Sequence, residues 1–509
     1  MNVSGMKVTI MGLGLNGGGL ESARYLALGG ADCTVTDLKN EQDLAPSIEK
    51  LEALPGVRPF RYVLGRHDID DFKNADLVIK NPGVPPGSPY LAAARRVETD
   101  ISLFLAASPA RLIAVTGSKG KSSTASALYR ALAEMRERSL LWGRAFLGGN
   151  ITVSPLSFLD GLTGGDDVVL ELSSWQLGDL RGRLRSEYDG AAPAGEALLK
   201  PRAAVLTSIM ADHQDRYDGM ESYVNDKRVL YQGQDKKDAT IASADDPWGR
   251  SFLRESPGRP LAYSEDPAGS GPADYLMEGP PGGSAGPTGW LDPRTGAGMV
   301  RLADGSVGEA VPAVLPAPGR HMKKNLLAAA LALADLGIPL SRIRESLGTF
   351  PGIEHRLEFF RDIGGIRFYN DTAATIPEAA AAAVEAFTGG GSGPADPLIL
   401  VTGGQDKNLD FSPLVTAAAR ARDIILLAGT GSDKLIPLLR AGGLSYHGPC
   451  TAIGDAAAAA LEAARGYRDR GAPGAVVVLS PGCASFGMFK NEFDRGRQWK
   501  EAVLNLPEG

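Results

Sequence analysis

Short apolar runs alternate with helical and turn-rich stretches along the whole chain. The runs with the length and composition of buried strands lie at residues 7–11, 33–36, 77–79, 112–115, 168–172, 203–207, 366–369, 397–402, 423–428 and 475–480. Helical stretches are predicted at residues 19–28, 326–336, 377–387 and 455–465. Because short apolar strands that alternate with helices form parallel sheets, the pattern predicts an α/β fold throughout.

The division into domains follows from the chain length and from the repeated strand–turn–helix starts. A chain of 509 residues exceeds a single hydrophobic core, so three α/β domains in series are expected. We predict domains at residues 1–109, 110–352 and 353–509, the first and last Rossmann-like and the middle one built on a phosphate-binding loop. Residues 255–300 are rich in Gly, Pro and Asp, which favours an insertion of loops and short strands, with disorder at 279–289.

Charge and composition exclude several classes of protein. With 60 acidic against 53 basic residues the net charge is −7, so nucleic-acid binding is not expected. The apolar stretches are too short for membrane insertion, and the first residues run straight into a strand without the pattern of a signal peptide. Three widely spaced cysteines suit a reduced compartment without disulfides or a zinc cluster. We therefore expect a cytoplasmic location.

The first strand leads into a glycine-rich turn. Gly12, Gly14 and Gly17 have the G-x-G-x-x-G spacing of a dinucleotide-binding turn, and Asp37 follows twenty residues after Gly17. The competing interpretation is an ordinary tight turn in a glycine-rich chain. Any diphosphate suits the same glycines, so NAD, FAD and a UDP-sugar all remain open.

A second turn of this kind, Thr116–Ser123 with the sequence TGSKGKSS, is more specific. It follows the buried run at 112–115 and opens a helix, which places backbone N–H groups and a helix N-terminus toward an anion. Lys121 would contact the outer phosphates and the Ser122 hydroxyl would contact Mg²⁺. The turn is shorter than the standard phosphate-binding loop, which would require glycine at Val115. Hydrolases, kinases, motors and ligases all use such a turn, so it does not identify the reaction.

Two polar residues follow predicted strands of the middle domain. Glu171 ends one buried run and His213 comes after another. Because ligands bind at the carboxyl ends of parallel strands, the two side chains are predicted to converge on a metal ion. The alternatives are a surface carboxylate and a structural histidine, and imidazole is an unusual ligand for Mg²⁺, which prefers oxygen. By itself, Lys227 would be interpreted as a solvated helix charge.

Together these segments resemble the ATP-dependent Mur ligases of bacterial cell-wall synthesis, with folylpolyglutamate synthases as relatives. The resemblance covers nearly the whole chain and is carried by TGSKGKSS (116–123), GGN (148–150), ELSSWQL (171–177), DHQDRY (212–217), Lys227, Asn325, EHR (354–356) and NDT (370–372). Within the family, the chain most resembles the branch that adds glutamate. The segments that carry this resemblance are GLGLNG (12–17), NPGV (81–84) and SPGCASFGMFKNEFDRG (480–496). Insertions near 181–199 and in 255–300 make this chain longer than a typical member.

The resemblance implies a reaction. ATP phosphorylates the terminal carboxylate of UDP-N-acetylmuramoyl-L-alanine, the amine of glutamate attacks the carbonyl of the resulting acyl phosphate, and phosphate leaves. A carboxylate alone is a poor electrophile, because oxide is a poor leaving group. Lys121, Mg²⁺ and a helix N-terminus would concentrate the positive charge that both anionic partners need. A monomer in peptidoglycan precursor synthesis is expected.

The resemblance also implies roles for single residues. ATP is expected at Gly117, Ser118, Lys119, Gly120, Lys121, Ser122, Ser123, Asn325, Arg356 and Asp371. Mg²⁺ is expected at Ser122, Glu171, His213 and Lys227, where Lys227 carries a carbamate that offers oxygen to the cation. The expected catalytic residues are Lys121, Glu171, His213 and Lys227. The UDP-linked substrate is expected at Leu15, Asn16, Asp37, Lys39, Gly83 and Asn150, and the incoming amino acid at Thr375, Lys407, Ser485 and Phe486.

The expected amino-acid pocket departs from the family pattern. Ala373 stands where the D-glutamate ligases have a lysine, and the aromatic that usually follows the FKN triplet is displaced by one, to Phe493. Losing a cation that faces a dicarboxylate would cost about 1.5–3 kcal/mol if no hydrogen bond replaced it. Either Lys407 and another basic group take over, or glutamate lies differently, which leaves L-glutamate as an alternative to D-glutamate.

Other classes of protein share parts of this pattern. An NAD-dependent oxidoreductase would explain the turn at 12–17 but leaves the loop at 116–123 without a task. A folylpolyglutamate-type ligase would begin with its ATP domain rather than with about 110 residues of another α/β domain. A binding module without catalysis is favoured if the metal ligands do not converge.

Overall fold

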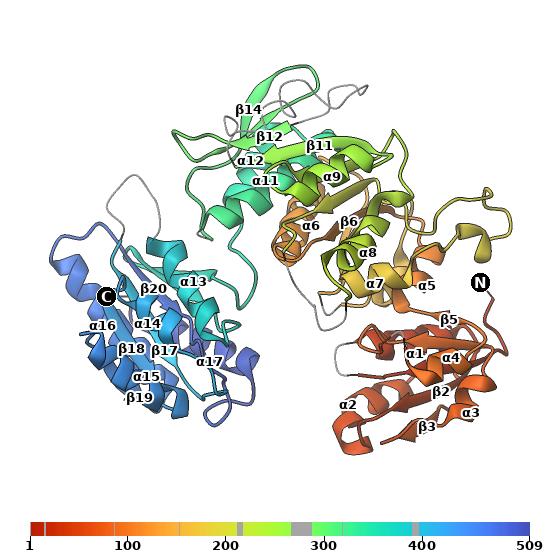
Figure 1. Cartoon of the computed structure of the whole chain (residues 1–509), viewed down its shortest axis with the longest axis horizontal. Helices are drawn as coiled ribbons and strands as arrows, with labels where there is room; N and C mark the ends of the chain where they lie inside the picture. Colours follow the sequence, from red (N-terminus) through yellow and green to blue (C-terminus); the bar gives the residue numbers. More distant parts are fainter. Residues whose placement is uncertain are drawn as a thin grey trace. The chain divides into compact units, whose positions relative to one another are not determined.

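The computed structural model describes residues 2–14, 17–85, 87–151, 153–210, 217–265, 288–317, 319–388 and 396–508. These residues form three sheets, of five, nine and six strands. By contacts within the chain, one compact unit comprises 1–313 with 324–347, and a second comprises 314–323 with 348–509. The predicted three-part α/β architecture is thus present, while the residue boundaries at 109/110 and 352/353 stay a prediction. Strands and helices alternate from the red to the blue end of the chain in Figure 1.

The first sheet is Rossmann-like. Its strands are parallel and lie in the order β3-β2-β1-β4-β5. One face is covered by α1, α2 and α5, the other by α3 and α4. The elements are β1 (Lys7–Met11), α1 (Gly18–Leu28), β2 (Asp32–Asp37), α2 (Glu41–Glu52), β3 (Arg61–Leu64), α3 (Ile69–Lys73), β4 (Leu77–Lys80), α4 (Pro89–Ala93), β5 (Val97–Glu98) and α5 (Asp100–Ala107).

The second sheet carries the loop that is predicted to bind phosphate, and its strands lie in the order β14-β13-β12-β11-β10-β9-β6-β8-β7. Its parallel strands include β7 (Ala145–Gly149), β8 (Asp167–Glu171), β6 (Arg111–Thr116), β9 (Ala203–Leu206), β10 (Ala239–Ser243) and β11 (Arg259–Ser264). Its helical segments are α6 (Lys121–Glu137), η1 (Pro155–Gly161), α7 (Ser174–Asp179), η2 (Arg185–Glu187), α8 (Met220–Gln232), α9 (Pro247–Glu255), α11 (Arg320–Asp335) and α12 (Leu340–Gly348). Leu326–Leu333 of α11 are completely buried, as their unbroken run of Leu and Ala predicts.

The stretch at 255–300 differs from its interpretation as an insertion. Its first part is β11, a regular parallel strand beside β10. In its last part, β12 (Thr288–Leu291) pairs parallel with β11, and an antiparallel extension through β13 (Gly298–Arg301) and β14 (Val307–Val311) follows. Residues 279–287 of the segment predicted to be disordered lie outside the described residues, whereas 288 and 289 open β12. Among the described residues of this stretch, Pro260 and Gly289 lie within strands of the sheet, and Gly296 lies in the turn between β12 and β13.

The third sheet has the order β15-β16-β20-β17-β18-β19, antiparallel only between β15 and β16. Alternate strand residues face α16 and α17 on one side and α13, α14 and α15 on the other. The elements are β15 (Glu358–Ile363), β16 (Ile366–Asn370), α13 (Pro377–Thr388), β17 (Leu398–Gly403), α14 (Ser412–Ala418), β18 (Asp423–Leu427), α15 (Thr430–Ala441), β19 (His447–Cys450), α16 (Ile453–Asp469), β20 (Ala475–Leu479) and α17 (Glu492–Leu504).

The predicted strands are all present, with ends that shift by no more than one residue. Among the described residues no helix has both the length and the apolar composition required to cross a membrane.

Candidate active site

The loop between β6 and α6 is held by contacts that only glycine permits. Gly117 has φ +148°, and a Cβ atom there would lie 1.9 Å from Thr207 Oγ1. Gly120 has φ +91° at the start of α6, and a Cβ atom there would lie 2.3 Å from Asn325 Oδ1. Backbone and helix N-terminus therefore lie where a phosphate can approach closely.

Ser118 and Lys119 hold this loop against the residues that follow β9. Their N–H groups donate to the carbonyl of Ser208, at 2.8 and 3.4 Å, and Ser118 Oγ accepts from Met210 N–H at 2.9 Å. The Ser118 backbone N–H and hydroxyl thus hold the loop in this structure, and a contact of Ser118 with ATP stays a prediction. The first turn of α6, which includes partly exposed Ser122 and Ser123, has N–H groups that the helix itself cannot satisfy.

Two lysines meet at the loop. Lys121 Nζ donates to Gly117 O at 2.9 Å and to Ser118 O at 3.0 Å. Lys227, on α8, is 1% exposed, and its Nζ also donates to Gly117 O at 2.9 Å while lying 4.4 Å from the centre of the Tyr223 ring. The structure therefore brings the predicted phosphate-binding lysine and the predicted carbamate position to one carbonyl oxygen.

Glu171 lies at the end of β8, one strand away from this loop, and is 1% exposed. Its Oε1 accepts from Asn150 Nδ2 at 3.0 Å, and its buried Oε2 contacts no hydrogen-bond donor among the described residues. Gly149 has φ +98° and lets β7 approach so closely that a Cβ atom would lie 2.2 Å from Glu171 O. A buried carboxylate oxygen without a donor is costly unless a cation binds it, so Glu171 fits the predicted Mg²⁺.

The rest of the expected metal site is only partly described. His213 falls in residues 211–216, outside the described residues. Within the described part of the chain, no group of three or more His, Cys, Asp or Glu side chains is arranged to hold a metal. Asn325 contacts the loop from α11, with its backbone carbonyl accepting from Thr124 Oγ1 at 3.4 Å.

The glycine turn of the first sheet is organised by Asp37. Asp37 Oδ2 accepts from Gly14 N–H at 3.1 Å, and its Oδ1 accepts from Lys39 N–H at 3.0 Å. Gly83 is exposed in the next loop and donates to Asn81 Oδ1 at 3.2 Å, while Asn81 Nδ2 donates to Gly12 O at 3.5 Å. The structure thus brings Asp37, Lys39 and the loop of Gly83 to one edge of the sheet. Leu15 and Asn16 lie outside the described residues.

One glycine of this turn was not predicted. A Cβ atom on Gly19 would lie 2.1 Å from Gly12 O, so Gly19 permits α1 to pack directly on the turn. The run of glycines at 17–19 contains this signal, but spacing alone does not show which member makes the close contact.

In the second unit, Asp371 follows β16 and is buried. Its Oδ1 accepts from Leu357 N–H at 3.1 Å and its Oδ2 from Ser480 Oγ at 2.6 Å. Burial raises the pKa of Asp371 to about 7, against the lowering effects of these bonds and of Arg356. Arg356 itself is exposed, between His355 and Leu357. Those two neighbours have φ +68° and +44°, a strained backbone that bonds from His355 N–H to Glu358 and from Leu357 N–H to Asp371 maintain.

The four residues expected around the amino acid lie after three adjacent strands, β16, β20 and β17. The segments of Thr375 and Ser485 are joined by a bond from Gly482 N–H to Ala374 O at 2.8 Å. The segments of Lys407 and Ser485 are joined where Gln405 and Ala484 exchange two backbone bonds, at 3.1 and 3.0 Å. Lys407 and Phe486 are exposed, Thr375 is half-buried, and Ser485 is buried.

A buried arginine that was not predicted holds two of these segments together. Arg495, on α17, is completely buried and donates from Nε to Thr372 Oγ1 at 2.9 Å, from Nη2 to Thr372 O at 3.0 Å and from Nη1 to Cys483 O at 3.1 Å. Burial lowers the pKa of its guanidinium to about 10. In the sequence FDRG it has no local signal, because both partners are distant in the chain.

Known proteins match this chain over its length. Sequence profiles described as "Mur ligase MurD-like, N-terminal domain" and "Mur ligase middle domain" match residues 6–102 and 115–278. Proteins named UDP-N-acetylmuramoylalanine–D-glutamate ligase are similar to it. The one from Treponema pallidum (strain Nichols) is 41% identical over 98% of each chain, the one from Roseiflexus sp. (strain RS-1) 37% over 99% of each, and that from Borreliella burgdorferi (strain ATCC 35210) 36% over 99% of each.

Solved structures share the fold. The UDP-N-acetylmuramate–alanine ligase MurC of Thermotoga maritima is 16% identical with a TM-score of 0.53, covering 98% of this chain and 99% of its own. MurF of Acinetobacter baumannii is 16% identical with a TM-score of 0.53, covering 98% and 94%.

Proposed function

We propose that this chain, which belongs to the Mur ligase family and to its D-glutamate-adding branch, joins glutamate to UDP-N-acetylmuramoyl-L-alanine at the expense of ATP. The observation that carries the proposal is the buried Glu171 Oε2, which has no donor among the described residues and lies one strand from the phosphate loop. A ligase that activates a carboxylate needs a cation at this place. The proposal includes a monomeric enzyme in the cytoplasm.

The proposed ATP site consists of the loop of Gly117 and Gly120, the first turn of α6 and the Lys121 ammonium group. The first turn of α6 would bind phosphate oxygens through N–H groups, and Lys121 would turn from its bonds to Gly117 O and Ser118 O to the phosphates. ATP supplies the phosphoryl group that converts the substrate carboxylate into a good acyl donor. Asn325 beside Gly120, and Arg356 and Asp371 in the second unit, are proposed as further ATP contacts.

Mg²⁺ would be held by Glu171, Ser122, His213 and a carbamate on Lys227. Carbon dioxide would add to the neutral Nζ of Lys227 with loss of a proton, which replaces a cation with an oxygen anion. That change suits a position where Lys227 and Lys121 both contact Gly117 O. Asn150, bonded to Glu171, would orient the carboxylate that is activated.

The UDP end would bind at the first sheet, where Asp37 organises the glycine turn and Lys39 and Gly83 lie at the same edge. Leu15 and Asn16 are proposed to contribute there. The bond from Gly14 N–H to Asp37 suits a nucleotide with phosphates over the glycines.

The amino acid would bind among Thr375, Lys407, Ser485 and Phe486. We propose D-glutamate as the substrate. L-glutamate is the second candidate, because Ala373 replaces the lysine that faces the substrate in the family. Lys407, exposed on a loop that pairs with Ala484, is the cation proposed to take over.

The test measures phosphate release and ligated product with the purified full chain, ATP, Mg²⁺ and UDP-N-acetylmuramoyl-L-alanine. D- and L-glutamate are supplied separately at equal concentration. Product with D-glutamate, and no phosphate release when the UDP-linked substrate is omitted, supports the proposal. A preference for L-glutamate would overturn the choice of isomer, and product with neither would overturn glutamate as the substrate.

A further inference from the structure

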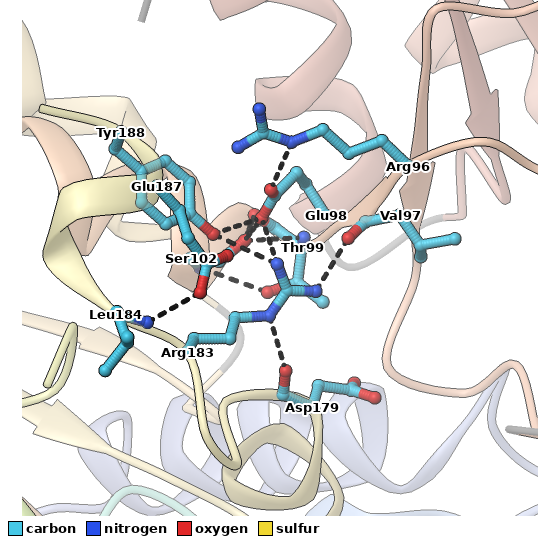
Figure 2. Close-up of polar contacts among 10 residues, drawn as sticks. All are labelled: Arg96, Val97, Glu98, Thr99, Ser102, Asp179, Arg183, Leu184, Glu187 and Tyr188. Atoms are coloured by element: carbon cyan, nitrogen blue, oxygen red, sulfur yellow. Dashed lines mark hydrogen bonds and ion pairs between the residues drawn. The ribbon is translucent and has the colours of Figure 1, made fainter. Parts of the chain in front are cut away.

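A buried carboxylate joins the first and second sheets. Glu98, at the end of β5, is completely buried. Its Oε2 accepts from Ser102 Oγ at 2.6 Å, Tyr188 OH at 2.7 Å and Arg183 Nη1 at 3.0 Å, and its Oε1 accepts from Arg96 Nε at 2.9 Å. Arg96 and Ser102 flank β5, whereas Arg183 and Tyr188 come from the insertion after α7 (Figure 2). We call these five residues the Glu98 cluster.

Arg183 connects three segments at once. Besides Glu98, its Nη2 donates to Val97 O at 2.6 Å and its Nε donates to Asp179 O at 2.9 Å (Figure 2). Its own backbone carbonyl accepts from Leu198 N–H at 2.9 Å, which closes the insertion on itself. Five N–H donors in a rigid plane make Arg suited to such a junction, so the end of α7 is fixed against β5.

The last residue of α7 also forms a second contact with the first sheet. Lys80 Nζ donates to Asp179 at 2.5 Å (Oδ1) and 2.7 Å (Oδ2), and the side chains are only 4% and 16% exposed. Lys80 ends β4, directly before the loop of Asn81 and Gly83, and α7 begins three residues after Glu171. A buried ion pair depends strongly on geometry, because desolvation offsets its attraction when the partners are misplaced. The pair thus links the loop proposed for UDP to the helix that follows the proposed metal ligand.

The contact between these sheets does not depend on the charges alone. Phe104 of α5 lies edge-on to Phe158 of η1, with ring centres 5.9 Å apart. Apolar residues of both sheets belong to one buried cluster that runs from Val3 to Ala262. Removing one ion pair should therefore leave the unit folded while loosening the relation between the two loops.

We propose that Lys80 and Asp179 form a positioning pair, locked by the Glu98 cluster, that sets the span between the UDP-binding loop and Glu171. The inference rests on the proposed function, since it needs a substrate with the nucleotide at one end and the reacting carboxylate at the other. Neither residue is assigned a contact with the substrate. Lys80 acts on the loop that follows β4, and Asp179 acts on α7, the helix that follows Glu171.

Two ligands distinguish a positioning role from a general loss of structure. UDP-N-acetylmuramoyl-L-alanine, here called the spanning substrate, needs both loops, whereas UDP needs only the loop of the first sheet. Calorimetry of the full chain would compare UDP with UDP-N-acetylmuramoyl-L-alanine for wild type, Lys80→Met and Asp179→Asn. For the variants we expect the Kd of the spanning substrate to rise at least about tenfold and that of UDP to change less than about twofold. The matched control is Lys200→Met, which removes a pair with Asp235 at 2.8 Å that is confined to the second sheet's part of the chain, and it should change neither.

Two further variants keep the test decisive if a single substitution impairs folding. The exchange Lys80→Glu with Asp179→Lys should recover most of the affinity lost in either single variant, because the coupling between neighbours is not additive. Arg183→Lys should also raise the Kd of the spanning substrate, and this variant should still unfold in a cooperative transition.

Equal losses for UDP and for the spanning substrate, or no loss for either, would overturn the inference. So would an exchange variant no better than the single ones. Because these are binding measurements, they are independent of catalysis. If the variants lose affinity only for the spanning substrate while the wild-type chain shows no ligation, the proposed function is refuted and the positioning pair stands.

Discussion

Lys121 and Lys227 donate hydrogen bonds to the same acceptor, the backbone carbonyl oxygen of Gly117, at 2.9 Å each. Two ammonium groups on one oxygen repel each other, most strongly where Lys227 is buried. A carbamate on Lys227 would replace one of the two cations at this oxygen with an anion. The pair therefore gives the proposed modification of Lys227 a physical reason.

Lys227→Ala should lower the ligation rate on the order of 100-fold, because it removes an oxygen ligand and leaves a cavity beside Tyr223. Acetate or another short carboxylic acid should restore part of the activity by placing an oxygen in that cavity. The control is Lys200→Ala, an exposed lysine of the same part of the chain. Labelled bicarbonate should give a carbamate carbon signal in the wild-type chain by NMR, and full activity in the Lys227→Ala protein would contradict the prediction.

Glu171→Gln separates metal binding from folding. Glutamine keeps an acceptor for Asn150 and removes a buried negative charge whose Oε2 contacts no described donor, so unfolding without Mg²⁺ should occur at the same temperature or higher. The rise in unfolding temperature that Mg²⁺ with ATP gives the wild type should disappear, and the rate should fall about 100- to 1000-fold. Scanning calorimetry with and without Mg²⁺ measures this. A lower stability without metal would show that the carboxylate is satisfied in another way.

The buried carboxyl of Asp371 predicts how stability depends on pH. In the unfolded chain it ionises near 3.8, whereas burial raises the folded pKa to about 7. Between these values the unfolded state has released the proton and the folded state keeps it. The stability gained from the buried neutral form is therefore complete below pH 3.8, is lost as the pH rises toward 7, and changes no further above it.

Asp371→Asn should remove this dependence, since an amide keeps an acceptor for Leu357 and does not ionise. Relative to wild type, the variant's free energy of unfolding should rise between pH 4 and 7, by a few kcal/mol at most and on the order of 1.4 kcal/mol per unit of pKa difference. Denaturant titrations of the second unit's transition across this range measure it. A difference between the two proteins that stays constant with pH would refute the assignment.

Arg495→Lys tests the junction behind the amino-acid site. Lysine cannot reach Thr372 and Cys483 together, so the second unit should lose roughly 2–4 kcal/mol of stability. The KM for glutamate should rise more than the KM for ATP, because Thr372 and Cys483 carry the loops of Thr375 and Ser485. Arg497→Lys is the control on the same helix, where the side chain is 61% exposed. Equal effects of both substitutions would remove the special role of Arg495.

Local patterns determined the elements that carry the site. Strand runs such as 475–480 are recognisable because a strand that is buried on both faces must be apolar at successive positions. Glycines 117 and 120 mark the phosphate loop, because their backbone angles and close contacts with Thr207 and Asn325 exclude side chains. The apolar run and the positive φ of these glycines are properties of a few consecutive residues, so the sequence displays them directly, whereas the contacts with Thr207 and Asn325 depend on the fold.

The glycine- and proline-rich composition of residues 255–300 predicted an insertion, whereas the structure places strands of the second sheet at both of its ends. Composition indicates turns but does not show whether the strands between them join an existing sheet. The pairing of Arg259–Ser264 with β10 depends on the edge that β10 offers, which is decided by the packing of the whole sheet.

The sequence by itself determined three α/β sheets, a phosphate loop and the family's motifs, because apolar periodicity and glycine positions are properties of short segments. Only the tertiary structure decided that Lys80 meets Asp179, 99 residues away, that Arg183 fills the space beside Glu98, and that Arg495 joins Thr372 to Cys483. Each of these charged side chains looks like an ordinary surface residue in its local sequence. Burial makes each one specific, since a charge removed from water must find its partner in another segment that the fold brings to it.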